Sequence, residues 1–132
     1  MTWGYAEAYA EKHDQFKKQF GGDTQKMYEA IVRAVQSEIV PNENISFIIP
    51  SGTAVQNARL LNLDSIQLSK DGTHLNELGD YVAGLTWFSK LTGVSVDDVD
   101  FVPNTVTLTD EQVAAIKKAV KDALANPYEV TK

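Results

Sequence analysis

The stretch Ile45-Ser46-Phe47-Ile48-Ile49-Pro50 decides the predicted fold class of this 132-residue chain. It is almost continuously apolar and rich in β-branched residues, a pattern typical of a strand that is covered on both faces. Ser51-Gly52-Thr53 then leads into a short helical pattern that ends near Leu61. A strand between two helical segments is characteristic of layered α/β proteins, so the sequence predicts an α/β fold.

The helix before this strand is predicted over Asp23–Ile39, where apolar residues recur at helical spacing. Asp23 or Thr24 can cap its start. Pro41 ends it, because the residue before a proline is pushed out of the α region. The preceding segment Met1–Phe20 carries aromatic residues without one clean face, so we expect a surface helix or an irregular segment there.

Two more helices are predicted later in the chain. The first begins at Asn76, a suitable N-cap, and ends at Gly93, which suits the left-handed position after a helix. Gly79 and Gly84 lie inside it and each costs up to about 1 kcal/mol relative to Ala, so we expect a close backbone approach at both. The last helix spans Thr109–Asn126 and starts with the spacing of a capping box.

A single buried strand leaves its backbone groups without partners, and each unpaired group costs on the order of 1–3 kcal/mol. The other strand-like pieces, Gln67–Ser69 and Val106–Leu108, are short. We therefore expect the partner strands to come from residues outside this chain, with residues 1–132 forming one partial domain. The unpaired strand would then expose apolar surface through which the chain could self-associate. The alternative is a segment less regular than a strand.

Composition narrows the function classes. The net charge of −6 and the scattered Lys and Arg residues argue against partners that are nucleic acids or anionic membranes. The sequence contains neither an apolar run long enough to span a bilayer nor a signal-peptide pattern. With no cysteine, two distant histidines and no Gly-rich phosphate loop, we expect neither a metal site nor a cofactor. Cellular location is not indicated.

The candidate functional residues are Asp71 and His74, which lie three residues apart on a Gly-containing loop just before a predicted helix. A carboxylate held against one imidazole nitrogen fixes the tautomer and leaves the other nitrogen free to act as a general base. The alternative is structural, with Asp71 capping the turn and His74 half buried. The spacing alone leaves both interpretations open.

No residue of the chain is a convincing nucleophile for such a base. Ser51 follows the predicted strand but lacks the flanking glycine of a Gly-x-Ser-x-Gly turn. Gly22-Asp23-Thr24 looks like a Gly-Asp-Ser turn, yet it follows a polar segment and makes an ordinary helix cap. We expect neither hydroxyl to act. His13, between Lys12 and Asp14, is expected to be solvated.

Two segments carry a resemblance to a known superfamily. Asp71-Gly72-Thr73-His74-Leu75, followed by Gly79, Tyr81 and Trp87-Phe88, resembles the C-terminal block of the SGNH (GDSL-like) hydrolases. Ile48–Arg59, which reads Ile-Ile-Pro-Ser-Gly-Thr-Ala-Val-Gln-Asn-Ala-Arg, is similar to the segment upstream of that block in a largely uncharacterised bacterial SGNH-like family. The resemblance covers about Thr2 to Gly93.

This resemblance implies the C-terminal part of a flavodoxin-like three-layer α/β/α sandwich and a serine ester hydrolase. His74 would be the general base, Asp71 its orienting partner, and the substrate an acyl ester, such as an O-acetyl group on a carbohydrate. The superfamily's nucleophilic Ser and oxyanion-hole Gly and Asn belong to earlier blocks without a counterpart here. We therefore expect this chain alone to be nearly inactive.

Gln56, Asn57 and Arg59 are expected near the site implied by this resemblance. Two alternatives remain open at the level of sequence. One is a non-catalytic remnant or binding module in which Asp71 and His74 are structural. The other is a helical interaction domain, which requires the strand prediction to be wrong.

Overall fold

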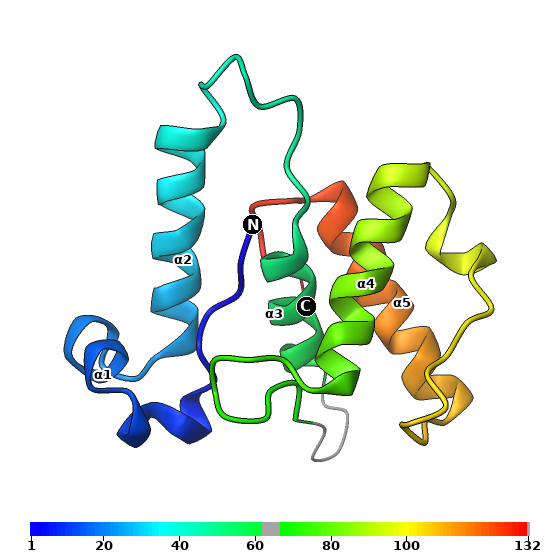
Figure 1. The fold of residues 1–132 in the computed structure, drawn as a ribbon, viewed down its shortest axis with the longest axis horizontal. Helices are drawn as coiled ribbons and strands as arrows, with labels where there is room; N and C mark the ends of the chain where they lie inside the picture. Colours follow the sequence, from blue (N-terminus) through cyan, green and yellow to red (C-terminus); the bar gives the residue numbers. More distant parts are fainter. Residues whose placement is uncertain (62–66, 132) are drawn as a thin grey trace.

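The computed structural model describes residues 1–61 and 67–131. Figure 1 shows α3, α4 and α5 packed together, with α2 on the other side of the N-terminal segment. In chain order the elements are η1 (Glu7–Lys12), α1 (Asp14–Phe20), α2 (Thr24–Ala34), the π-helical turn η2 (Val35–Ile39), α3 (Ser51–Leu60), α4 (Glu77–Thr92), η3 (Val96–Asp98) and α5 (Asp110–Ala125).

The strand predicted at Ile45–Pro50 is wrong, and with it the α/β class and the three-layer α/β/α sandwich. Within the described residues the backbone pairs in β fashion only at an isolated bridge between Ser69 and Leu75. A strand requires a neighbour, and the described part of the chain brings none to this segment. The chain is a helical domain, and its segment 45–50 has neither helix nor strand.

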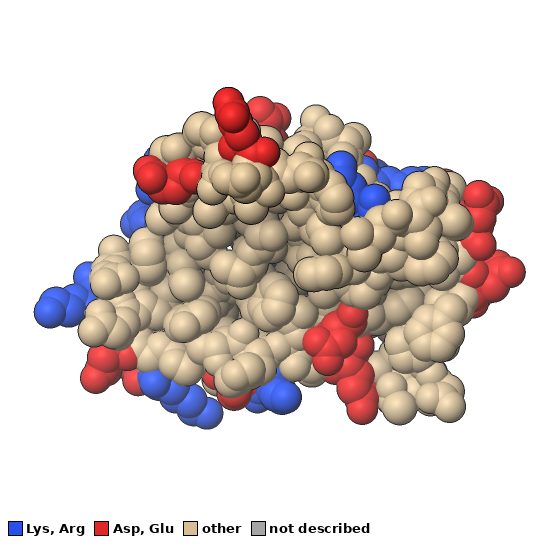
Figure 2. All heavy atoms as spheres, turned by 45° about the horizontal axis from the view of Figure 1, so that its top comes forward, with Lys and Arg blue, Asp and Glu red and all other residues tan. Residues whose placement is uncertain are grey.

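The apolar pattern of Ile45–Pro50 does not reflect burial on both faces. Ile45 is 42% exposed and Phe47 is 51% exposed, as are the nearby Ile39 at 39% and Val40 at 48%. Figure 2 turns this end of the molecule forward and shows uncharged side chains across the middle of the face, with Lys, Arg, Asp and Glu around its edge. Self-association through this surface stays a prediction.

Helix α3 lies at the centre of the core, and every residue from Ser51 to Ala58 is buried. Ala54, Val55 and Ala58 are each at most 3% exposed. They belong to one cluster with Val82 of α4 and Ile116 of α5. Sequence reasoning found a helical pattern in this region, and the structure confirms it.

The buried polar residues of α3 hold the C-terminal segment of the chain. The Thr53 hydroxyl donates a hydrogen bond to the Pro127 carbonyl oxygen at 2.6 Å. The Asn57 side chain donates to the Ala119 carbonyl oxygen at 3.2 Å and accepts from the Thr131 backbone N–H at 2.9 Å. Because buried polar groups need partners, the bonds to Pro127 and Thr131 fix the chain after α5 across α3, and the bond to Ala119 ties α3 to α5 itself.

The predicted helix starts are confirmed by their caps. The Asp23 carboxylate accepts a hydrogen bond from the Lys26 N–H at the start of α2, and the Asn76 side chain accepts from two N–H groups at the start of α4. Thr109 and Gln112 form the expected capping box of α5. Gly93 ends α4 with φ 74°, a left-handed conformation that glycine adopts without strain. These signals are local, which explains why the sequence displays them.

The N-terminal segment is extended over residues 1–6 and runs between α2 and α3 (Figure 1). Gly4 lies against the Thr24 carbonyl oxygen of α2, and Gly52 of α3 lies against the Thr2 carbonyl oxygen. A side chain at either glycine would collide with this backbone. Residues 1–6 of the segment Met1–Phe20 are therefore irregular, as expected for part of it, and they pack tightly between α2 and α3.

The two glycines inside α4 differ in their surroundings and give a test of the packing. A Cβ at Gly79 would collide with the Leu68 carbonyl oxygen, which confirms the close approach expected there. A Cβ at Gly84 would meet nothing within 4 Å, so the close approach expected at Gly84 is wrong. We expect Gly79→Ala to lower the free energy of unfolding by about 1–3 kcal/mol. Gly84→Ala should raise it by about 0.5–1 kcal/mol, because Ala favours the helix. Urea unfolding of both variants measures the difference, and equal shifts would contradict this packing.

Candidate functional site

The candidate site is the loop Gln67–Asn76, which folds back on itself before α4. The Lys70 N–H donates to the His74 carbonyl oxygen at 3.1 Å, and the Asn76 N–H donates to the Leu68 carbonyl oxygen at 3.1 Å. Gly72 stands at the tip with φ 91°, where a larger residue would be strained. These bonds bring the predicted Asp71 and His74 together at the end of the loop.

The Asp71 carboxylate is the centre of this loop. Its Oδ1 accepts hydrogen bonds from the Thr73 N–H at 3.0 Å, the Thr73 hydroxyl at 3.1 Å and the His74 N–H at 2.8 Å. Its Oδ2 lies 2.6 Å from Nδ1 of His74. The His74 backbone N–H, the His74 side chain and the Thr73 groups together hold the pKa of Asp71 well below its usual range.

The His74 ring is oriented by Asp71 and open on its other side. Because Nδ1 donates to the carboxylate, the tautomer leaves a lone pair on Nε2. No described residue forms a hydrogen bond with Nε2, and the His74 side chain is 71% exposed. The arrangement presents a base toward solvent, and the structural interpretation with His74 half buried does not fit this exposure.

The N-terminal part of the chain holds the loop by donating hydrogen bonds to the loop's backbone carbonyl groups. The Trp3 indole N–H donates to the Thr73 carbonyl oxygen at 2.8 Å, and the Ala6 N–H donates to the Gly72 carbonyl oxygen at 2.9 Å. His13 Nε2 lies 3.0 Å from the Asp71 carbonyl oxygen, and the His13 ring packs on Tyr5. The expectation that His13 is solvated is therefore wrong. Sequence reasoning missed all three supports, because no local pattern links them to the loop.

The two hydroxyls rejected as nucleophiles are both buried. Ser51 is 3% exposed at the start of α3, and Thr24 is 4% exposed at the start of α2. The Thr24 hydroxyl donates to the Tyr5 carbonyl oxygen. Neither is among the hydrogen-bond partners of His74 in the part of the chain that the structure describes.

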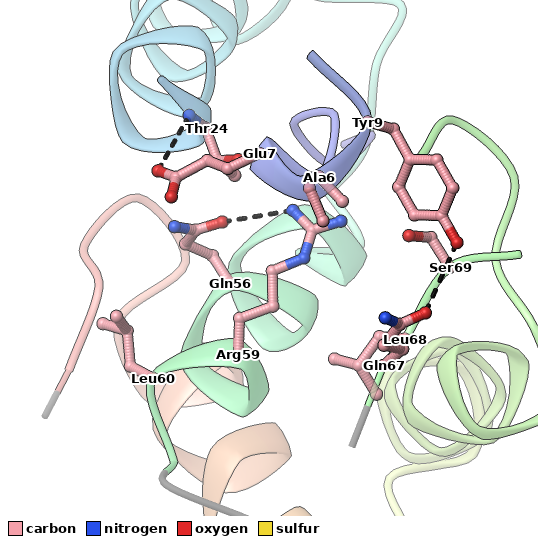
Figure 3. A pocket seen from close by; sticks show the side chains of 11 residues that line it. Ala6, Glu7, Tyr9, Thr24, Gln56, Arg59, Leu60, Gln67, Leu68 and Ser69 are labelled. Carbon is pink, nitrogen blue, oxygen red and sulfur yellow. Dashed lines mark hydrogen bonds between the residues drawn. The ribbon is translucent and has the colours of Figure 1, made fainter. Parts of the chain in front are cut away.

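The polar residues of α3 that were expected near the site divide into two groups. Asn57 binds the C-terminal segment, as described above. Gln56 and Arg59 instead line a cavity of about 270 Å³ together with Tyr9, Gln67 and neighbouring residues (Figure 3). Tyr9 lies against Gly72 and its hydroxyl donates to the Lys70 carbonyl oxygen at 3.3 Å, so this cavity adjoins the candidate loop.

Arg59 is the positively charged residue of this cavity, and its surroundings fix its position and lower its pKa. Its Nη1 donates to the Gly4 carbonyl oxygen at 2.7 Å and to Gln56 Oε1 at 3.4 Å. Its Nη2 is buried without a hydrogen-bond partner. Burial lowers the pKa of Arg59 to about 10, against the opposing effect of the Glu7 charge, so the guanidinium stays charged at neutral pH.

Other kinds of site lack support in residues 1–61 and 67–131. No three His, Asp or Glu side chains of these residues gather as metal ligands would. None of the described helices is both long enough and apolar enough to cross a membrane.

Comparison with known proteins places these observations in a family. The sequence model of a domain of unknown function, DUF4886, matches residues 1–123. A crystal structure of a DUF4886 family protein from Bacteroides uniformis ATCC 8492 is similar in fold, with a TM-score of 0.84 and 35% sequence identity. The match covers 98% of this chain and 48% of that protein, so the chain spans about half the length of the solved structure. No curated protein matches the chain.

The low pKa of Asp71 predicts how the loop responds to acid. A carboxylate whose pKa is depressed on folding stabilises the folded state above its unfolded pKa of about 3.9, and this contribution is lost as pH falls through the lower folded value. We expect the amide signals of Thr73 and His74 to keep their folded positions in NMR titrations well below pH 4. In Asp71→Asn these amides should be shifted at every pH. Signals in the unchanged chain that move near the ordinary Asp pKa would contradict the bonding described here.

Proposed function

This chain belongs to the DUF4886 family, named for a domain of unknown function, and we propose from its loop geometry that it carries the base of an ester hydrolase. The proposed reaction is of the SGNH type, on an acyl ester, with His74 as general base and Asp71 as its orienting partner. The observation that carries the proposal is the 2.6 Å contact between Asp71 Oδ2 and His74 Nδ1, beside an exposed ring. An O-acetyl group on a carbohydrate is the substrate that the SGNH resemblance implies.

In the proposed mechanism each partner of the dyad has one task. A serine hydroxyl attacks the ester carbonyl carbon while Nε2 of His74 takes the hydroxyl proton. The same nitrogen returns the proton to the departing alcohol oxygen, which leaves an acyl-serine. A water molecule then attacks the acyl carbon while Nε2 takes its proton, and that proton passes to the serine oxygen as the acid leaves. Asp71 keeps the proton on Nδ1 and stabilises the imidazolium that forms between these steps.

The serine and the oxyanion hole would be supplied by residues outside this chain. Two observations support this part of the proposal. No described hydroxyl forms a hydrogen bond with His74 Nε2, and the similar protein of Bacteroides uniformis is longer, since the match covers 48% of it. We accordingly treat residues 1–132 as one partial domain that is nearly inactive by itself.

The test compares variants in the complete product of the gene that encodes this chain, with p-nitrophenyl acetate as substrate. His74→Gln and Asp71→Asn should each lower kcat/KM by on the order of 10³–10⁴, because the base or its orientation is lost. Asp100→Asn is the matched control, since Asp100 is exposed and outside the loop, and it should keep full activity.

A second readout separates catalysis from stability. A fluorophosphonate probe labels only an activated serine, so labelling should disappear in His74→Gln while the melting temperature stays nearly unchanged, as expected for an exposed side chain. Hydrolysis that survives in His74→Gln would refute the proposal.

A non-catalytic role is the second candidate, and one observation favours it. Asp71 Oδ1 accepts three hydrogen bonds from Thr73 and His74, which is what a carboxylate that caps a turn does. Under this alternative the gene product would show no hydrolysis and no probe labelling. Asp71→Asn would then lower stability alone.

A further inference from the structure

A groove of about 570 Å³ lies between α4 and residues 99–105. The segment after η3 runs back along α4 toward the start of α5 (Figure 1). The Tyr81 hydroxyl donates to the Phe101 carbonyl oxygen at 2.9 Å, and the two rings meet edge to face with their centres 6.3 Å apart. These contacts join the two walls of the groove.

The side chains that line this groove are open to solvent. Tyr81 and Leu85 are buried and form its floor, whereas Phe88 is 44% exposed and Phe101 is 66% exposed. Gly84 is exposed as well, and a Cβ there would meet nothing within 4 Å. A molecule in the groove can therefore touch these residues directly and remove their apolar surface from water.

Helix α4 is apolar on two faces, and only one of them is covered. Val82 and Leu85 belong to the core cluster, whereas Trp87, Phe88 and Leu91 are exposed on the outside of the same helix. A helix that is apolar all round is normally buried all round. An exposed apolar patch on a globular protein commonly marks a binding site, so the open face of α4 favours a ligand.

The charge at one end of the groove selects the kind of ligand. Glu77 and Asp80 line it in the first turn of α4, and the ion pairs of the described chain join other residues. The described residues of its lining include no Lys, Arg or His. The aromatic faces of Phe88 and Phe101 also attract cations. This end therefore favours a positive charge and disfavours a carboxylate or a phosphate.

The size and charge of the groove suit a small molecule better than a second copy of the chain. From Glu77 to Phe88 the helix rises by about 16 Å, and the volume is in the range of small-molecule sites. The chain carries a net charge of −6, and two copies docked through this face would bring their carboxylates together. Carboxylates in a first turn stabilise any helix, but here they stand at the edge of an open apolar groove.

We propose that this groove binds a small amphiphilic cation. Its ammonium group lies beside Glu77 and Asp80, and its apolar tail lies along Gly84 toward Phe88. The proposal stands apart from the esterase proposal, because it uses neither Asp71 nor His74.

The test compares three ligands that share one tail, since n-octylammonium, n-octanol and octanoate differ in the charge of the head group. Each is added to the 132-residue chain at neutral pH and constant ionic strength, and binding is followed by ¹⁵N NMR. Octylammonium should give saturable shifts at residues that line the groove and should bind about threefold or more tightly than octanol. Octanoate should bind most weakly, because Glu77 and Asp80 repel it.

Gly84→Leu is the variant that blocks the groove. Its side chain would occupy the groove without disturbing the core, because position 84 is exposed and Leu favours a helix more than Gly does. The saturable shifts should disappear in this variant. Gly84→Ala is the matched control, since it leaves most of the groove open and should bind octylammonium nearly as the unchanged chain does.

Removal of the two carboxylates separates the head group from the tail. The double variant Glu77→Gln, Asp80→Asn should weaken octylammonium binding by a factor of about 3–10 and leave octanol binding unchanged. Glu38→Gln, Glu43→Gln removes two charges from exposed positions outside the groove and should bind like the unchanged chain. Circular dichroism verifies folding, and if the first double variant does not fold, the three ligands and Gly84→Leu decide.

Three results would overturn the proposal. The first is binding of octanol or octanoate that equals or exceeds that of octylammonium. The second is octylammonium binding that survives unchanged in Gly84→Leu. The third is a dimer in sedimentation that Gly84→Leu abolishes, because a second copy would then cover the groove.

Discussion

The packing of the extended segment 1–6 between α2 and α3 is the constraint on which the rest of the structure depends. Its carbonyl groups accept from Gly52 of α3, Arg59 and Thr24, and its donors reach the loop before α4. An extended chain between two helices has no helical partners of its own, so its backbone groups that are removed from water must bond to neighbouring elements. Its neighbours supply those partners from distant parts of the sequence, and the same bonds position the candidate site.

The features that sequence predicted well are those with local physical causes. Asp23, Asn76 and Thr109 cap helices because each side chain bonds to an N–H two or three residues on, and such spacing is visible in one dimension. The Asp71–His74 contact belongs to the same class, since a three-residue loop closure forms it. Its chemical role is not a local property, and so the sequence left it open.

The features that sequence missed depend on partners far along the chain. Ile45–Pro50 has the composition of a buried strand, but a strand is defined by its neighbours and the described residues offer none. Gly79 and Gly84 look alike in sequence, and only the position of Leu68 distinguishes them. The same holds for Arg59, whose guanidinium donates to the carbonyl oxygen of Gly4, 55 positions away in the sequence.

The hydrogen bond from the Trp3 indole to Thr73 joins residues 70 positions apart, and it bears on the order of events during folding. Contacts of such long range close late, because the entropy of the intervening loop must be lost before they contribute. Helices α4 and α5 carry their own caps and can form early, whereas the loop that presents His74 gains its support from the N-terminal segment. The support that the N-terminal segment gives to this loop would therefore form after α4 and α5, whereas the Asp71–His74 contact itself closes locally.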